Sequence, residues 1–143
     1  MKSVLLIASC MLVSWLSGCA QQAIMPPLPE TAVNIITKDA TGQLTSLYPP
    51  AQTHFVMVQG EPDLLGNQFK NKLRNCGYAL HENQENTAAN QPVGIQLSYL
   101  LDALTDVSHY GYYRLTLNIG KEQLSRLYDA SDLTQPNYWS YRK

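Results

Sequence analysis

The chain has 143 residues, of which 45% are hydrophobic and 15% are charged. This composition suffices for a buried core and excludes a disordered protein, and the length is that of a single domain. The formal net charge is −1 and no run of basic residues is present, which excludes a protein that binds nucleic acid through rows of phosphates.

The first 18 residues have the layout of a bacterial signal peptide. Lys2 supplies a positive start, residues 4–16 are almost wholly apolar, and Leu-Ser-Gly-Cys stands at 16–19. The apolar stretch is shorter than the stretch of about 20 residues that a membrane-spanning helix needs. The sequence at 16–19 resembles the lipobox of bacterial lipoproteins. This resemblance implies cleavage between Gly18 and Cys19, a diacylglycerol on the Cys19 sulfur, and an acyl chain on the new amine, which together anchor a protein stably.

The neighbouring residue and the other cysteines refine this prediction. Position 20 is Ala and not the Asp that retains lipoproteins in the inner membrane, so we expect the periplasmic face of the outer membrane. Cys10 leaves with the signal peptide and Cys19 carries lipid, so only Cys76 remains and no internal disulfide can form. We expect Cys76 on the apolar face of a helix, as a small hydrophobe. An unmodified Cys19 and a reactive or metal-binding Cys76 are the alternatives.

A proline-rich tether is predicted at residues 19–30, which contain Pro26, Pro27 and Pro29 and show no periodicity. The folded domain is expected to occupy residues 31–143. It starts with a helix at 31–47, whose apolar stripe consists of Val33, Ile36, Ala40, Leu44 and Leu47.

The helix at 31–47 is weakened by Gly42 and ended by the prolines at 49–50. Residues 53–59 include four consecutive apolar residues, which predicts a central strand covered on both faces. The next helix, at 64–76, is the best defined of the chain.

The helix at 64–76 has Asp63 near its first turn and Gly77 as its left-handed cap. A short strand at 78–81 follows, and then a polar loop at 82–92. The remaining third alternates apolar and polar residues at 93–104, 113–119 and 124–128.

These three segments predict an antiparallel meander, with a tight turn at 119–122. Residues 138–141 either close the sheet or form an exposed aromatic tail. The predicted fold is a small α+β domain with a mostly antiparallel sheet and two helices on one face.

Groups for catalysis do not converge in the sequence. His54, His81 and His109 are scattered without metal-ligand spacing, and no Gly-x-Ser-x-Gly motif is present for a serine nucleophile. Asp102 and Asp106 are interpreted as solvated carboxylates of a strand end and turn. We therefore predict no catalytic residue, no metal and no cofactor.

Several motifs, taken in order behind the lipobox, resemble the TrbH family of conjugal transfer lipoproteins, which belong to type IV secretion systems. The residues that carry this resemblance are Leu47-Tyr48-Pro49-Pro50-Ala51, Leu73-Arg74-Asn75-Cys76-Gly77-Tyr78, Leu97-Ser98-Tyr99-Leu100-Leu101-Asp102, Tyr113-Arg114-Leu115-Thr116-Leu117-Asn118-Ile119-Gly120, Leu124-Ser125-Arg126-Leu127-Tyr128 and Trp139.

The resemblance implies a structural subunit of the conjugation channel at the outer membrane. Its partners would be the membrane, other channel subunits and further copies in a ring, with no direct contact to nucleic acid. Tyr138, Trp139 and Tyr141 are the candidate partner contacts, because Tyr and Trp often dominate interface energetics. Packing of Trp139 on the domain's own core is the alternative.

Three other functions remain open from the sequence. An accessory lipoprotein of outer-membrane assembly or lipopolysaccharide export would show an apolar groove. A periplasmic enzyme or cell-wall binder would show a pocket with convergent polar groups. An immunity or exclusion lipoprotein of a mobile element would not co-purify with channel subunits.

Overall fold

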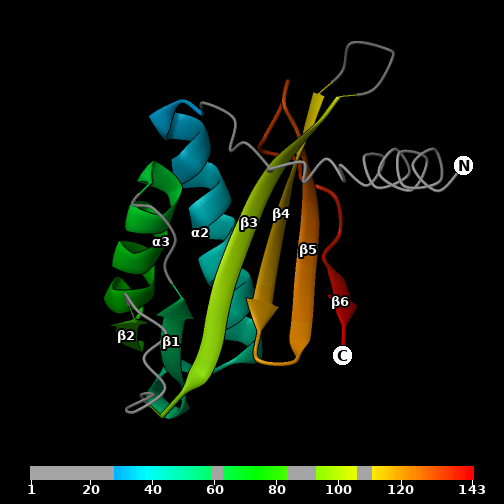
Figure 1. Cartoon of the computed structure of the whole chain (residues 1–143). Coiled ribbons are helices and arrows are strands. Elements are labelled where there is room, and N and C mark those ends of the chain that lie inside the picture. Colours follow the sequence, from blue (N-terminus) through cyan, green and yellow to red (C-terminus); the bar gives the residue numbers. More distant parts are fainter. Residues whose placement is uncertain (1–27, 59–62, 84–92, 106–110) are drawn as a thin grey trace, which may run out of the picture.

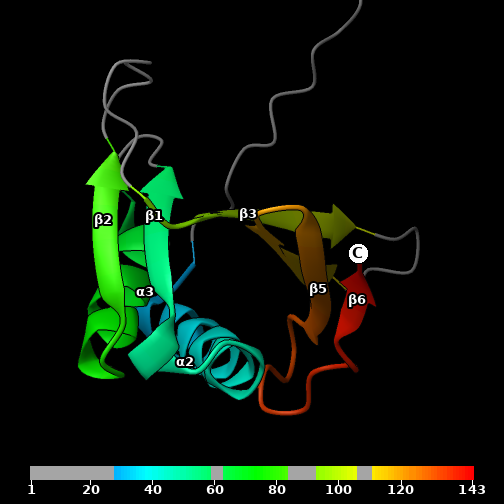
Figure 2. The ribbon, with the colours of Figure 1, turned by 90° about the horizontal axis from the view of Figure 1, so that it is seen from below.

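The computed structural model describes residues 28–58, 63–83, 93–105 and 111–143. In these residues two α-helices lie against one face of a six-stranded sheet (Figure 1 and Figure 2), which confirms the predicted α+β domain. The elements are α2 (Glu30–Leu47), the 3-10 turn η1 (Pro50–Gln52), β1 (His54–Val58), α3 (Leu64–Asn75), β2 (Ala79–Asn83), β3 (Ile95–Thr105), β4 (Gly111–Ile119), β5 (Glu122–Asp129) and β6 (Ser140–Arg142).

The strands follow the order β2-β1-β3-β4-β5-β6. β1 is parallel to both of its neighbours. It is parallel to β2 because α3 carries the chain back to the same end of the sheet before β2 begins. The other three pairs are antiparallel, and β3, β4 and β5 form the predicted meander. Gly120 has a φ of +59° in the turn between β4 and β5. A glycine adopts this left-handed conformation without strain.

The core lies between the helices and the inner sheet face. β1 lies between β2 and β3, and its Phe55, Val56 and Met57 are buried. The prediction of a central strand covered on both faces is wrong in position and cover, because β1 is second from the sheet edge and both helices lie on one face (Figure 2). From the meander, Leu97 and Leu117 are fully buried. Side chains along these strands therefore alternate between the two faces of the sheet, as predicted, and every second side chain points toward the helices.

Helix α2 spans the predicted residues and begins at Glu30. Its stripe is buried as far as Leu44, but the next stripe residue, Leu47, is 44% exposed because the helix ends there and the chain turns away. Gly42 does not interrupt the helix, and a Cβ at this position would meet no atom within 4 Å. Neither helix of the described residues has the length and apolar character of a membrane span.

Helix α3 begins where Asp63 accepts a hydrogen bond of 2.7 Å from the Gly66 N–H, and it ends before Gly77, whose φ is +90°. The left-handed conformation of Gly77 confirms the predicted C-terminal cap of this helix. The prediction that Cys76 packs on the apolar face is wrong, because its thiol is exposed. The helix ends one residue earlier, at Asn75, and the buried face is completed by Tyr78 beyond the turn.

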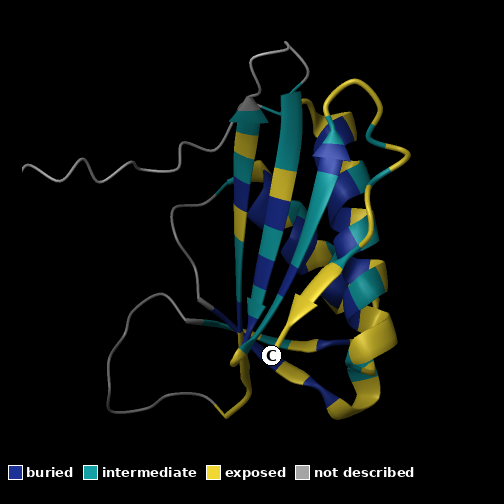
Figure 3. Ribbon diagram, turned by 90° about the vertical axis from the view of Figure 1, so that its right-hand side faces the viewer, coloured by how far each residue is buried: buried dark blue, intermediate teal, exposed yellow. Residues whose placement is uncertain are grey.

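On the sheet face away from the helices the strands carry intermediate and exposed residues (Figure 3), among them Arg114, Thr116 and Asn118 of β4. The interpretation of Asp102 as a solvated turn residue is wrong, because β3 continues to Thr105 and places Asp102 opposite Arg114 of β4. The two side chains form an ion pair, in which Arg114 Nε lies 3.2 Å from Asp102 Oδ1. Asp106 lies outside the described residues.

Candidate functional site

Residues 130–143, which we call the C-terminal strap, contain all three candidate partner contacts of the described domain. β5 ends at the same end of the molecule at which α2 begins, and the strap returns from there along the side of β5 (Figure 1). It ends as β6, which pairs with residues 123–125 of β5. Residues 140–142 of the strap thus close the sheet. This was one of the two outcomes predicted for residues 138–141.

Trp139 anchors the strap. Its ring is partly buried and packs against the core, and the guanidinium carbon of Arg126 lies 5.3 Å from the ring centroid. This distance permits a cation–π contact. The Trp139 Nε1 is buried and has no hydrogen-bond partner among the described residues. Trp139 therefore packs on the domain's own core, held by apolar and cation–π contacts.

Arg126 is held in turn by a carboxylate of α2. Its Nη1 lies 2.9 Å from Asp39 Oδ1, and the Tyr128 hydroxyl donates to Asp39 Oδ2 at 2.6 Å. Burial, and then the hydrogen bond to Asp39, raise the pKa of Tyr128 above its ordinary value. Asp39 therefore fixes two inward polar side chains of β5, Arg126 and Tyr128, against the helix, and Arg126 is oriented to face Trp139.

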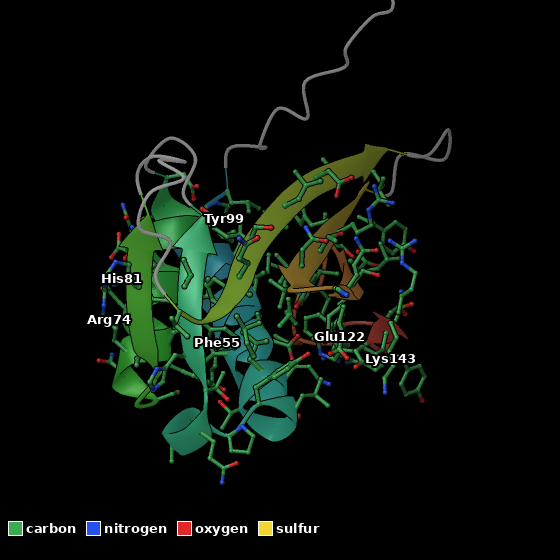
Figure 4. All side chains as sticks on the ribbon, turned by 60° about the horizontal axis from the view of Figure 1, so that its bottom comes forward. Phe55, Arg74, His81, Tyr99, Glu122 and Lys143 are labelled. Atoms are coloured by element: carbon green, nitrogen blue, oxygen red, sulfur yellow. The ribbon has the colours of Figure 1, made fainter. Side chains whose placement is uncertain are left out.

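A second carboxylate joins the end of α2 to the end of the strap. Glu122 accepts a hydrogen bond from the Tyr48 hydroxyl. Hydrogen bonds with Tyr48 and then with Tyr141 lower the pKa of Glu122, and the charge of Lys143 adds to the effect. Glu122 and Lys143 lie at the same corner of the domain (Figure 4). The C-terminal part of the strap is thus fastened at two points, Trp139 and this corner.

The outer side of the strap is open. Tyr138 is 98% exposed and Tyr141 is 45% exposed, so two of the three predicted contacts are accessible on the monomer. Between the strap and α2 runs a groove with a volume of about 530 Å³. Its apolar walls are Ile35, Leu133 and Pro136, and its polar groups are Lys38, Asp39, Gln43 and Thr134.

Asp39 and Arg126 were missed as site residues in the sequence. A signal was present, because Arg126 stands between Leu124 and Tyr128 on the inward positions of a strand. An inward arginine needs a buried anionic partner. The partner itself could not be identified, since Asp39 is 87 residues away in the chain.

The described residues bring no group of three His, Cys, Asp or Glu side chains together as a metal site. His54 and His81 lie on β1 and β2, and both are exposed. His109 lies outside the described residues, as do Gly18 and Cys19 at the predicted cleavage site.

The comparison with protein families gives a match over almost the whole chain. The sequence model described as "Conjugal transfer protein TrbH" matches residues 17–142, a range that includes Cys19 and all of the strap except its last residue. No curated protein and no solved structure matches the chain. The chain belongs to the TrbH family of conjugal transfer proteins.

Proposed function

We propose that the protein is a lipid-anchored structural subunit of the type IV secretion channel that carries out conjugation. It stands at the periplasmic face of the outer membrane, and it acts by docking to other channel subunits, without catalysis. The observation that carries this proposal is the family match, because residues 17–142, which include Cys19, match the conjugal transfer family.

The anchor is assigned to Cys19. The first residue of α2 is Glu30, so the 10 residues 20–29 separate Cys19 from this helix. A chain of that length reaches at most about 36 Å when fully extended. The end of the domain at which α2 begins would therefore be held close to the bilayer, and the domain would meet its neighbours there at high effective concentration.

Partner contact is assigned to the outer side of the strap. Tyr138 and Tyr141 present exposed aromatic rings, which contribute strongly to interfaces when a partner buries them. Because a tether would hold the domain close to its neighbours, contacts of moderate strength suffice for assembly. The groove beside α2 does not favour a lipid-export role, because Lys38 and Asp39 interrupt its apolar walls.

Purification of the tagged, full-length protein in detergent from conjugating cells tests this function. Secretin-like or channel-core subunits should co-purify with it. Tyr138→Ala in combination with Tyr141→Ala should reduce their recovery, whereas Asp102→Asn, on the open sheet face, should not. Recovery of no channel subunit with the unaltered protein would contradict the proposal and would favour an immunity or exclusion lipoprotein.

A further inference from the structure

We infer that one end of the domain is a docking surface for a different protein, which contacts it through apolar side chains and carboxylates. This end, which we call the distal end, lies opposite the end at which α2 begins (Figure 1). Its exposed residues are Leu47, Val93, Ile95, Lys121 and residues 141–143. The inference rests on the proposed function and extends the partner contact already assigned to Tyr141.

Apolar side chains are exposed as a group at the distal end. Val93 is 96% exposed, and more than a third of each of Leu47, Ile95 and Tyr141 is exposed. Exposed apolar side chains that stand singly are normal on a protein surface, whereas a group of them with polar residues at its rim marks a contact surface. The distal end therefore has the composition of an interface.

Contacts between neighbouring elements make this group continuous. A Cβ at Gly120, in the turn between β4 and β5, would lie 3.6 Å from Ile95 Cγ2 at the start of β3. On the other side of the same turn, Glu122 accepts a hydrogen bond from the hydroxyl of Tyr48, which follows Leu47 at the end of α2. The start of β3, the turn and the end of α2 thus present one surface.

Positive charge surrounds the exposed apolar side chains. Lys121, Arg142 and Lys143 are all exposed, and Lys143 Nζ lies 5.8 Å from the centroid of the Tyr141 ring. The carboxylate of Glu122 lies among them, but it already accepts a hydrogen bond from a tyrosine hydroxyl. Carboxylates of a partner would complement the three cationic side chains, since surfaces of opposite charge attract and like charges disfavour association.

The opposite end of the domain carries acidic side chains. Glu30 begins α2, Asp129 ends β5, and Asp132 follows in the strap (Figure 1). Under the proposed anchor at Cys19 this acidic end is nearest the bilayer, and the distal end lies farther away by about 27 Å, the length of the 18-residue α2. Neighbouring anchored copies would present their distal ends at the same height, where like charges meet. The partner is therefore a different protein, which supplies both apolar side chains and carboxylates.

Photocrosslinking of the full-length protein in conjugating cells tests the docking surface. Benzoylphenylalanine replaces Val93, and in the control it replaces Leu64, which is exposed at the opposite end of the domain. The Val93 probe should give an adduct with a different protein at roughly tenfold or more the control yield, because a docked partner is held beside the probe at high effective concentration. The crosslinked peptide should contain apolar residues together with Asp or Glu. An adduct with lipid, an adduct with a second copy of this chain, or equal yields for both probes would overturn the inference.

Charge reversal tests the chemistry of the partner. Lys121→Glu in combination with Arg142→Glu should lower the yield of the Val93 adduct by roughly fivefold or more, because like charges would then face each other. Lys38→Glu, at an exposed position halfway along α2, should leave the yield unchanged. Replacing the carboxylates of the crosslinked peptide by lysine should restore the adduct of the doubly reversed protein.

The outcomes separate this inference from the proposed function. A yield that does not respond to charge reversal would overturn the inference, provided that circular dichroism shows the variants to be folded. Channel subunits that co-purify with the unaltered protein report on the proposed function alone. If they are recovered while Val93 gives no protein adduct, the distal end is not a docking surface and the proposed function stands.

Discussion

The body of the domain and its C-terminal strap are stabilised in different ways. In the body, side chains of α2, α3 and the inner sheet face are fully buried, as Ile36, Leu73 and Leu117 show. In the strap, no residue is fully buried, and its one large anchor, Trp139, stays partly exposed. The body carries the stability of the fold, and the strap is a weaker attachment whose aromatic residues are available to partners.

Truncation of one core side chain should damage the protein more than removal of the strap's end. Leu117→Ala should lower the free energy of unfolding by about 2–5 kcal/mol, because Leu117 is 0% exposed and a cavity would remain. Deletion of residues 138–143 should lower it by about 1–2 kcal/mol, since a partly exposed Trp139 contributes less than the 3–5 kcal/mol lost with a buried tryptophan. Urea unfolding followed by circular dichroism measures both.

The deletion has a second expected outcome, which separates stability from docking. The truncated monomer should remain folded, while recovery of the channel complex should fall. Unchanged recovery of the complex after deletion would show that the strap is not a docking element.

Two of the carboxylate–arginine pairs among the described residues, Asp39–Arg126 and Asp102–Arg114, sharpen the comparison. Asp39→Ala should lower the free energy of unfolding by about 2–3 kcal/mol, because it leaves the half-buried Arg126 and the Tyr128 hydroxyl without their acceptor. Asp102→Ala on the open sheet face should lower it by about 0.2–1 kcal/mol, because Arg114 is exposed. Equal effects in thermal or urea unfolding would mean that Asp39 does not stabilise the contact between α2 and β5.

High pH should weaken the contact between α2 and β5. Tyr128 has a raised pKa in the folded protein, so its phenol stays protonated where the unfolded chain begins to ionise, near pH 10. Its stabilising effect is complete below that pH and declines as the pH rises toward the folded pKa, by at most about 1.4 kcal/mol per pH unit. Tyr128→Phe should flatten this decline in urea unfolding, and Tyr138→Phe, at a fully exposed position, should not.

The smallest expected effect is a gain in stability. Gly42→Ala should raise the free energy of unfolding by about 0.5–1 kcal/mol, because alanine is the better helix former and its Cβ would meet no atom within 4 Å. Gly77→Ala, at a φ of +90°, should lower it and provides the matched contrast. A loss of stability in Gly42→Ala would contradict the open space beside α2.

Local patterns in the sequence were sufficient to predict most of the helices and strands in the body of the domain. Alternation predicted the strands of the meander, and Asp63 and Gly77 marked the ends of α3, because these signals act over a few residues. The strand at Ala79–Asn83 extended into the predicted polar loop, since pairing with β1 outweighs the low strand propensity of Glu82 and Asn83.

Features that depend on distant contacts could not be read from the sequence. The Asp102–Arg114 pair required the register of β3 on β4, and the Asp39–Arg126 pair required α2 to lie beside β5. Exposure of Cys76 depended on a helix end one residue earlier than expected. Composition alone identified the candidate contacts Tyr138, Trp139 and Tyr141. Composition could not distinguish the partly buried Trp139 from the exposed tyrosines.

Replacement of Cys19, the proposed lipid-anchor residue, tests the central claim most directly. Cys19→Ser keeps the size of the side chain but cannot carry a thioether-linked diacylglycerol, so the protein should leave the envelope membrane fraction and conjugation frequency should collapse. Cys76→Ser, which changes the exposed thiol of the folded domain, should alter neither. If the Cys19→Ser protein still fractionates with envelope membranes and still supports conjugation, a lipid-anchored docking subunit is the wrong description of this protein.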